Sequence, residues 1–331
     1  MDTSSAVQNA EQLALFDSGS IDIAKLRAIG EKLQTGPRRA PLTVRGYADD
    51  WRLFTAWCQR VGRSALPASG DTVWLYITHV LVERKSKTST ATRHVSAILY
   101  YHRAANLPMP PREKVQGLLT DVRRDRHERY EGKRALTPQD LARLCAACDG
   151  ATNAGARDRA LLVLGFATSM RRSELSALDL SDVTFESKGV AVLVRRSKND
   201  QLGRGRLIAV WPGAKPATDP IELLRAWIKR RGSWAGPLFS RIDGFDQVHH
   251  DRIGGSAINT LLKRNLKRIG IDPKPYGAHS LRAGAVTAAA ELGRSDQEIM
   301  ALSGHRTANI MRQYVRKARV FDGRNPLAGV L

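Results

Sequence analysis

The first third of the chain carries apolar and aromatic residues at steps of three and four, the spacing of one helix face. A helix is predicted from a capping Thr43 to about Arg60, and its aromatic stripe, read as core, comprises Tyr47, Trp51, Phe54 and Trp57. Three further helices are expected to contain residues 73–80, 95–102 and 115–122, and a short one is predicted at 21–33. The pattern therefore predicts a compact helical domain.

Polar and charged breaks divide the chain into parts. Residues 1–20 are small and polar and are interpreted as a flexible arm, and residues 21–125 form the helical domain. Residues 126–135 form a charge-dense, basic linker. Thr137, followed by Pro138, is a helix start, so a second domain is expected over 136–331. A length of 331 residues fits two domains.

The second domain mixes helical and strand patterns. Residues 157–168 are strongly apolar and predict a buried helix, and further helices are expected from Asp219 and over 256–269. Residues 189–196 and 204–211 are rich in β-branched side chains and flank a polar segment, which predicts a hairpin with Lys198 near its tip. The fold class is therefore mainly α with a small antiparallel β-sheet.

The net charge of the chain indicates what kind of partner it binds. Lys and Arg number 53 against 32 Asp and Glu, a net charge of +21. Such an excess attracts polyanions, so nucleic acid is the leading partner and an anionic membrane surface the weaker one. No apolar run approaches the length of a membrane span, and the N-terminus lacks the order of a signal peptide. We expect a cytoplasmic, nucleoid-associated protein.

Two small clusters suggest metal sites but are interpreted otherwise. Cys145 and Cys148 have the spacing of half a zinc site, yet no second pair accompanies them, so we read them as small buried residues. His249, His250 and Asp251 stand among glycines and are interpreted as exposed loop residues. No metal site is predicted.

Most of the candidate catalytic residues lie near the carboxyl end of the chain. His279 and Arg282 are three apart and would share one helix face, and His305 precedes Tyr314 by nine residues. Upstream, Arg171 and Glu174 stand in R-x-x-E-L. Arginine grips a phosphate with two donors, and tyrosine can be a covalent nucleophile. These residue types suit a phosphodiester substrate.

The order R-x-x-E-L, hairpin lysine, H-x-L-R, G-H and Tyr over residues 168–314 resembles the tyrosine recombinases of the phage integrase family, which includes the Xer and Cre proteins. The resemblance implies a two-domain clamp, with a helical core-binding (SAM-like) domain and an α+β catalytic domain. Family members often have Gly just before the arginine segment, where this chain has Ser169-Met170.

The resemblance also implies roles for the catalytic residues. Tyr314 would attack the scissile phosphorus and form a 3′-phosphotyrosyl link. Arg171 and Arg282 would hold the non-bridging oxygens, and His305 would donate a further hydrogen bond. Lys198 would be the general acid, His279 would assist proton transfer, and Glu174 would orient Arg171. A covalent ester conserves the bond energy, so no cofactor is expected.

The expected partner is double-stranded DNA with inverted-repeat half-sites, bound by a homotetramer in synapsis. Lys87, Thr88 and Arg93 begin the third helix of the first domain and are predicted to contact DNA. The apolar C-terminal residues are predicted to dock on a neighbouring protomer.

Two other functions stay open from the sequence. One is a type IB topoisomerase-like enzyme, which uses similar residues to relax DNA as a monomer. The other is a basic, helical DNA-binding regulator in which the catalytic site has decayed. Neither the target DNA sequence nor the choice between integration, excision and resolution follows from the sequence.

Overall fold

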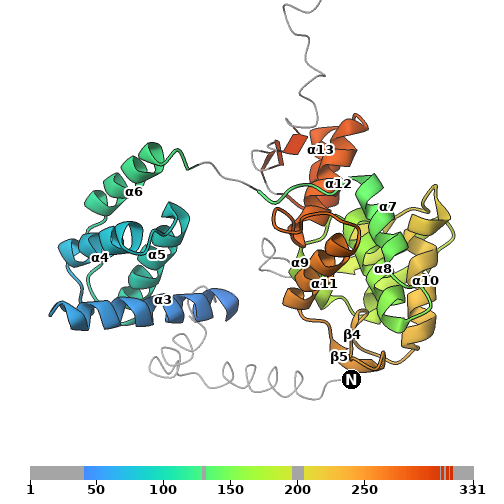
Figure 1. Ribbon diagram of the computed structural model, residues 1–331, viewed down its shortest axis with the longest axis horizontal. Coiled ribbons are helices and arrows are strands. Elements are labelled where there is room, and N and C mark those ends of the chain that lie inside the picture. The colour runs from blue at the N-terminus through green and yellow to red at the C-terminus, as the bar shows by residue number, and fades with distance from the viewer. Residues whose placement is uncertain are drawn as a thin grey trace, which may run out of the picture. The chain divides into compact units, whose positions relative to one another are not determined.

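The computed structural model describes residues 41–128, 132–195 and 205–305, together with 307, 308, 311, 312, 314 and 315 (Figure 1). The chain divides into two units, Met1–Tyr130 and Glu131–Leu331, and the division falls inside the stretch predicted as linker. The predicted arm at 1–20, the helix at 21–33 and the C-terminal tail lie outside the described residues.

The described part of the first unit is helical. Its elements are α3 (Pro41–Arg60), α4 (Gly70–Val82), α5 (Thr88–Ala104) and α6 (Glu113–Asp125). Helix α5 packs against α3, α4 and α6, and the core between them includes Phe54, Tyr76, Ile77 and Ile98. The aromatic stripe on α3 is therefore core, as predicted. The predicted cap was wrong, because Thr43 lies within α3 and not before its first residue.

Helix α8 lies at the centre of the second unit. The helices here are α7 (Pro138–Ala147), α8 (Asn153–Ala167), α9 (Arg172–Ala177), α10 (Pro220–Arg231), α11 (Gly255–Arg268), α12 (His279–Glu291) and α13 (Asp296–Ser303). Helix α8 packs against α7, α10 and α12, which surround it in Figure 1. Its residues Leu161, Leu162 and Leu164 are fully buried, which confirms the predicted apolar helix. The predicted cap is also confirmed, since the Thr137 side chain accepts from the N–H of Asp140.

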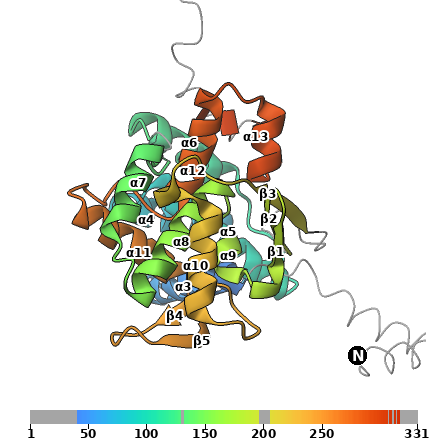
Figure 2. The same cartoon turned by 90° about the vertical axis from the view of Figure 1, so that its right-hand side faces the viewer.

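A three-stranded antiparallel sheet of order β1-β2-β3 lies beside these helices (Figure 2). Its strands are β1 (Val183–Glu186), β2 (Gly189–Val194) and β3 (Arg206–Val210). Strands β2 and β3 are the predicted hairpin, with Leu193 opposite Leu207. Its tip, which carries Lys198, lies outside the described residues. Strand β1 was not predicted, because its four residues carry too short a pattern.

A second hairpin pairs β4 (Ser240–Ile242) with β5 (Val248–Arg252). The prediction that His249, His250 and Asp251 lie in a loop was wrong, since all three are on β5. His249 contacts the Asp243 carboxylate at 2.8 Å, and no group of three metal-binding side chains occurs within the described ranges. The contact with Asp243 holds the His249 ring in place.

The fold class predicted from the sequence is confirmed: helices dominate and the sheets are small and antiparallel. The three cysteines are buried and unpaired, as expected, and burial raises the pKa of Cys145 to about 12. Within the described part of the chain, no helix is long and apolar enough to cross a membrane.

Candidate active site

Arg171 is held in place by Glu174. It stands at the N-cap of α9, where its backbone N–H donates to Glu174 Oε2 at 2.9 Å. Its guanidinium Nη1 donates to Glu174 Oε1 at 2.6 Å, and Glu174 is only 3% exposed. One buried carboxylate thus fixes both the main chain and the side chain of Arg171, which is the orienting contact that the sequence predicts.

Arg282 is brought to the same region from α12. Its side chain is 1% exposed, and its Nη1 donates to the carbonyl oxygen of Ser169 at 2.7 Å. Its Nη2 is buried and has no hydrogen-bond partner among the described residues. Burial, followed by the positive charge of Arg171, lowers the pKa of Arg282 to about 10. The group is still a cation at neutral pH, with a donor that lacks an acceptor.

His279 and Tyr314 face this pair of arginines. His279 is the first residue of α12, one turn before Arg282, and its ring centroid lies 6.5 Å from that of Tyr314. Burial, then the charges of Arg282 and Arg171, lower the pKa of His279, so its imidazole is neutral at pH 7 and able to accept a proton. Tyr314 packs against a small core that includes Ile299 and Met311.

His305 follows α13 on a glycine turn. Gly304 takes the left-handed conformation with φ +65°, and a Cβ there would lie 3.1 Å from the Arg206 guanidinium carbon. The left-handed backbone favours glycine, and any larger residue would also press on the Arg206 side chain. The His305 Nδ1 lies 2.7 Å from the Ser303 hydroxyl. Burial, then Arg282, Arg171, His279 and Arg206, lower the pKa of His305 to about 4.

Arg206 is a site residue that sequence reasoning missed. It begins β3, which lies next to α13 (Figure 2), and its Nη1 donates to the carbonyl oxygens of Leu302 and, at 3.2 Å, Ala301. Its Nη2 lies 3.8 Å from Glu174. A signal was present in the strand pattern, because Arg206 alternates with the buried Ile208 and Val210 and so shares their face.

The predicted DNA-contacting residues differ in how they are placed on α5. Lys87 is the exposed N-cap residue. Thr88 is 2% exposed, and its N–H and hydroxyl donate to the Glu128 carboxylate at 3.0 and 2.7 Å. Arg93 donates twice to the buried Asp50, at 2.7 and 2.9 Å. Of the three, only Lys87 has an exposed side chain engaged by none of these contacts.

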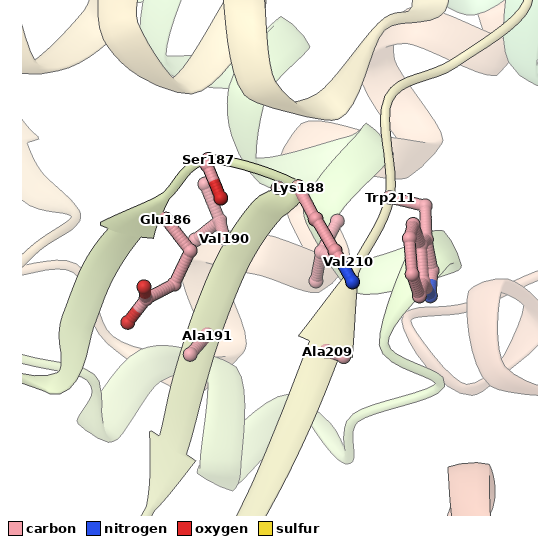
Figure 3. A pocket seen from close by; sticks show the side chains of 9 residues that line it. Glu186, Ser187, Lys188, Val190, Ala191, Ala209, Val210 and Trp211 are labelled. Atoms are coloured by element: carbon pink, nitrogen blue, oxygen red, sulfur yellow. The ribbon is translucent and has the colours of Figure 1, made fainter.

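Pocket shape alone does not lead to this cluster. One pocket lies at the end of the three-stranded sheet, lined by residues that include Glu186, Lys188 and Trp211 (Figure 3), and it contains none of the predicted catalytic residues. A second pocket touches the cluster through Glu174 and is also lined by Arg195. Charge and hydrogen bonding, not concavity, identify the site.

The arrangement suits an anion. Three arginines, Arg171, Arg206 and Arg282, influence one another electrostatically, and Glu174 is the carboxylate among them. Two neutral histidines and a tyrosine complete the cluster. Of the predicted catalytic residues, the structure brings together Arg171, His279, Arg282, His305 and Tyr314, whose catalytic roles stay predictions. Lys198 lies outside them.

The family model of the phage integrase family matches residues 134–319. The chain belongs to the phage integrase family. The chain is similar to an integrase/recombinase XerD homolog of Selenomonas ruminantium, with 28% identity covering 94% of this chain and 92% of the relative. It is also 27% identical to a tyrosine recombinase XerD of Halalkalibacterium halodurans, covering 85% of this chain and 89% of the relative. The resemblance to tyrosine recombinases is confirmed.

A solved structure shares the fold of this chain. The XerH site-specific recombinase, solved bound to a palindromic difH substrate after cleavage, superposes with a TM-score of 0.64. The match covers 87% of this chain and 79% of the XerH chain, at 16% identity. At that identity the likeness concerns the fold, and it agrees with the mainly helical architecture described above.

Proposed function

We propose that this integrase is a site-specific recombinase that breaks and rejoins double-stranded DNA through a 3′-phosphotyrosyl intermediate. The observation that carries the proposal is the buried Nη2 of Arg282, which has no hydrogen-bond acceptor among the described residues. Arg171 and Arg206 add positive charge around it, so the missing acceptor is expected to be an anion. A buried donor without an acceptor costs free energy, and a phosphate oxygen would supply the missing partner.

In this proposal the Tyr314 oxygen forms a bond to the scissile phosphorus while the bond from phosphorus to the 5′ oxygen breaks. Arg171 and Arg282 hold the non-bridging oxygens, and each such donor is typically worth about 10²–10³ in rate. The phenol proton passes to His279 as the base, whose ring centroid lies 6.5 Å from that of Tyr314, and Lys198 protonates the departing 5′ oxygen. Attack by another 5′-hydroxyl reverses these steps and exchanges strands.

The proposal extends to the partners and location expected from the sequence. XerH was solved on a palindromic substrate, which supports a duplex with inverted half-sites as the ligand of this integrase. A net charge of +21 favours the same ligand. Assembly as a homotetramer and a cytoplasmic, nucleoid-associated location stay predictions. Footprinting on the DNA that flanks its own gene would identify the target sequence.

Covalent capture on a nicked footprinted duplex tests the chemistry. The wild type is expected to form a protein–DNA adduct, and Tyr314→Phe none, because the nucleophilic oxygen is gone. Arg171→Lys should slow adduct formation by about 10²–10³, since a point charge cannot replace a two-donor fork. Tyr276→Phe, which alters a buried tyrosine of the same unit, should keep the adduct.

The same assay separates the other functions. Absence of a wild-type adduct under all conditions would mean a non-catalytic DNA-binding regulator. An adduct together with relaxation of supercoiled DNA by a monomer, without any need for paired sites, would mean a topoisomerase-like enzyme.

Deletion of residues 320–331 tests the tetramer. If the apolar tail docks on a neighbouring protomer, the deletion should impair synapsis of two duplexes at least about tenfold more than binding of one duplex, because only synapsis needs the protomer contact. Gel-shift and synapsis assays at matched salt measure both. Equal loss of both activities, or loss of neither, would reject the tail contact.

A further inference from the structure

Ser303 makes two contacts that together settle the hydrogen positions around His305. It ends α13 and is fully buried. Its Oγ lies 2.6 Å from the carbonyl oxygen of Ile299 and 2.7 Å from His305 Nδ1. A hydroxyl has one proton to donate, and a carbonyl oxygen can only accept.

Only one assignment satisfies both contacts. The Ser303 hydroxyl donates to Ile299, because two oxygens at 2.6 Å without a proton between them would repel each other. The remaining lone pair of Oγ then accepts from His305, so Nδ1 carries a proton. In a neutral imidazole only one nitrogen is protonated, which leaves His305 Nε2 with a lone pair.

This tautomer conflicts with a simple phosphate contact. With Nδ1 engaged by Ser303, Nε2 is the ring nitrogen left for substrate, and a lone pair there repels a phosphate oxygen. His305 can donate to phosphate while keeping its serine contact only after Nε2 also gains a proton. The imidazolium would then donate from both nitrogens, one to Ser303 and one to the phosphate.

We propose that Ser303 is a positioning residue that locks His305 as the Nδ1–H tautomer, so that His305 binds the scissile phosphate as an imidazolium formed when the anion arrives. The step takes up one proton from solvent and breaks no covalent bond. The inference rests on the proposed function for the identity of the anion, but the tautomer is a property of the DNA-free protein.

The charges around His305 explain why protonation waits for the anion. The described groups that act on it are Arg282 and His279 from α12, Arg171 at α9 and Arg206 on β3, and all of them oppose a positive charge. Glu174 is paired with Arg171 and lies near Arg206, and Tyr314 faces His279. With the pKa of His305 lowered to about 4, the empty site holds a neutral ring at pH 7. A phosphodiester brings a negative charge that offsets the arginines.

Nitrogen-15 NMR of the full chain labelled in histidine tests the tautomer directly, with His305 assigned by His305→Gln. At pH 7 the DNA-free protein should give widely separated ring shifts with the proton on Nδ1. Saturating sulfate, whose charge is constant over this pH range, should bring the two shifts together, as in an imidazolium. In Ser303→Ala the neutral ring should move toward the Nε2–H tautomer. A wild-type ring protonated on Nε2, or one still neutral with sulfate bound at pH 6, would overturn the proposal.

The pH profile of cleavage supplies a second readout that a merely structural serine would not move. On its alkaline limb the wild type should lose about tenfold per pH unit, as one essential proton is lost. In Ser303→Ala the neutral His305 ring is free to carry its proton on Nε2 and to donate it to the phosphate. The loss of cleavage rate per pH unit should therefore shrink to less than about twofold. Ser303→Thr, which keeps the hydroxyl, should restore the wild-type limb.

Two controls keep the outcomes separate. Thr78→Val removes a hydroxyl that bonds back to the Trp74 carbonyl in the first unit, and it should keep the wild-type profile. In His305→Gln the glutamine amide can donate a hydrogen bond at every pH, so the cleavage rate of this variant should not show the alkaline decline. If the cleavage rates of wild type and Ser303→Ala fall equally with rising pH, Ser303 does not control the tautomer of His305. Failure of all adduct formation would reject the proposed function, while the NMR result on free protein would stand.

Discussion

Ser169 takes a left-handed backbone conformation, with φ +51°, although a residue with a Cβ disfavours it. The residue is fully buried, and its hydroxyl has no partner among the described residues. Its carbonyl oxygen accepts the hydrogen bond from Arg282. The strained turn therefore directs a carbonyl oxygen toward the arginine.

Replacing Ser169 by glycine is expected to stabilise the protein by up to about 1 kcal/mol. Relief of the left-handed strain, about 1–2 kcal/mol, exceeds the cost of a more flexible unfolded chain, about 0.5–1 kcal/mol. Urea unfolding of the full chain measures the difference. Ser169→Ala is the matched control, because it removes the same hydroxyl but keeps the Cβ. If Ser169→Ala is as stable as Ser169→Gly, backbone strain is not the cause.

Residue types in the site could be predicted from the sequence, but their pairings could not. Spacing along α12 places His279 and Arg282 on one face, and the short distance from Arg171 to Glu174 makes their contact local. The contact of Arg282 with Ser169 joins residues 113 positions apart, so no local pattern reports it. Arg206 left a weak local signal, a charge on the inward face of a strand.

The helices and strands around the site are joined at the base of the β2–β3 hairpin. At the end of β2, Arg195 contacts Asp179 and, at 2.9 Å, Asp182. At the start of β3, Arg206 donates to the last carbonyl groups of α13, the helix that leads to His305. The hairpin that carries Lys198 is therefore connected to the element that positions His305.

Substitution Arg206→Gln should destabilise the protein by roughly 2 kcal/mol, because charged hydrogen bonds to the α13 carbonyls are lost in a largely buried place. Arg241→Gln is the matched control: its side chain is 50% exposed and that of its partner Asp251 is 75% exposed, and exposed pairs are worth less than about 1 kcal/mol. Urea unfolding gives both values. Amide exchange in α13 should speed up only in Arg206→Gln; equal changes in both variants would mean that Arg206 does not anchor the helix.

At the scale of the whole molecule, the main feature is the large net positive charge. The excess of Lys and Arg amounts to +21, and the exposed Lys87 lies at the start of a 17-residue helix in the first unit. Arg93 is already committed to Asp50, which is 2% exposed. Lys87 is thus better placed for a phosphate contact, while Arg93 contributes to the stability of the first unit.

Binding to duplex DNA is therefore expected to weaken steeply with salt. Each phosphate neutralised adds about 0.9 to the slope of log affinity against log salt, and Lys87→Ala should reduce that slope by about 1 with unchanged thermal stability. Arg93→Ala should instead lower the unfolding temperature, because it removes two charged hydrogen bonds from the buried Asp50 carboxylate. Fluorescence anisotropy over a salt series and thermal unfolding measure the two effects. An unchanged slope in Lys87→Ala would remove Lys87 from the DNA contacts.

The sequence by itself determined the helical first unit, the β2–β3 hairpin and the set of side chains suited to a phosphodiester. Helix periodicity, N-caps such as Thr137 and strand alternation act over a few residues, so they are readable without coordinates. Only the tertiary structure decided that Arg282 has a buried donor without an acceptor and that Arg206 holds α13. Those features arise where segments far apart in sequence pack together, and the free energy of such contacts depends on burial that no local pattern contains.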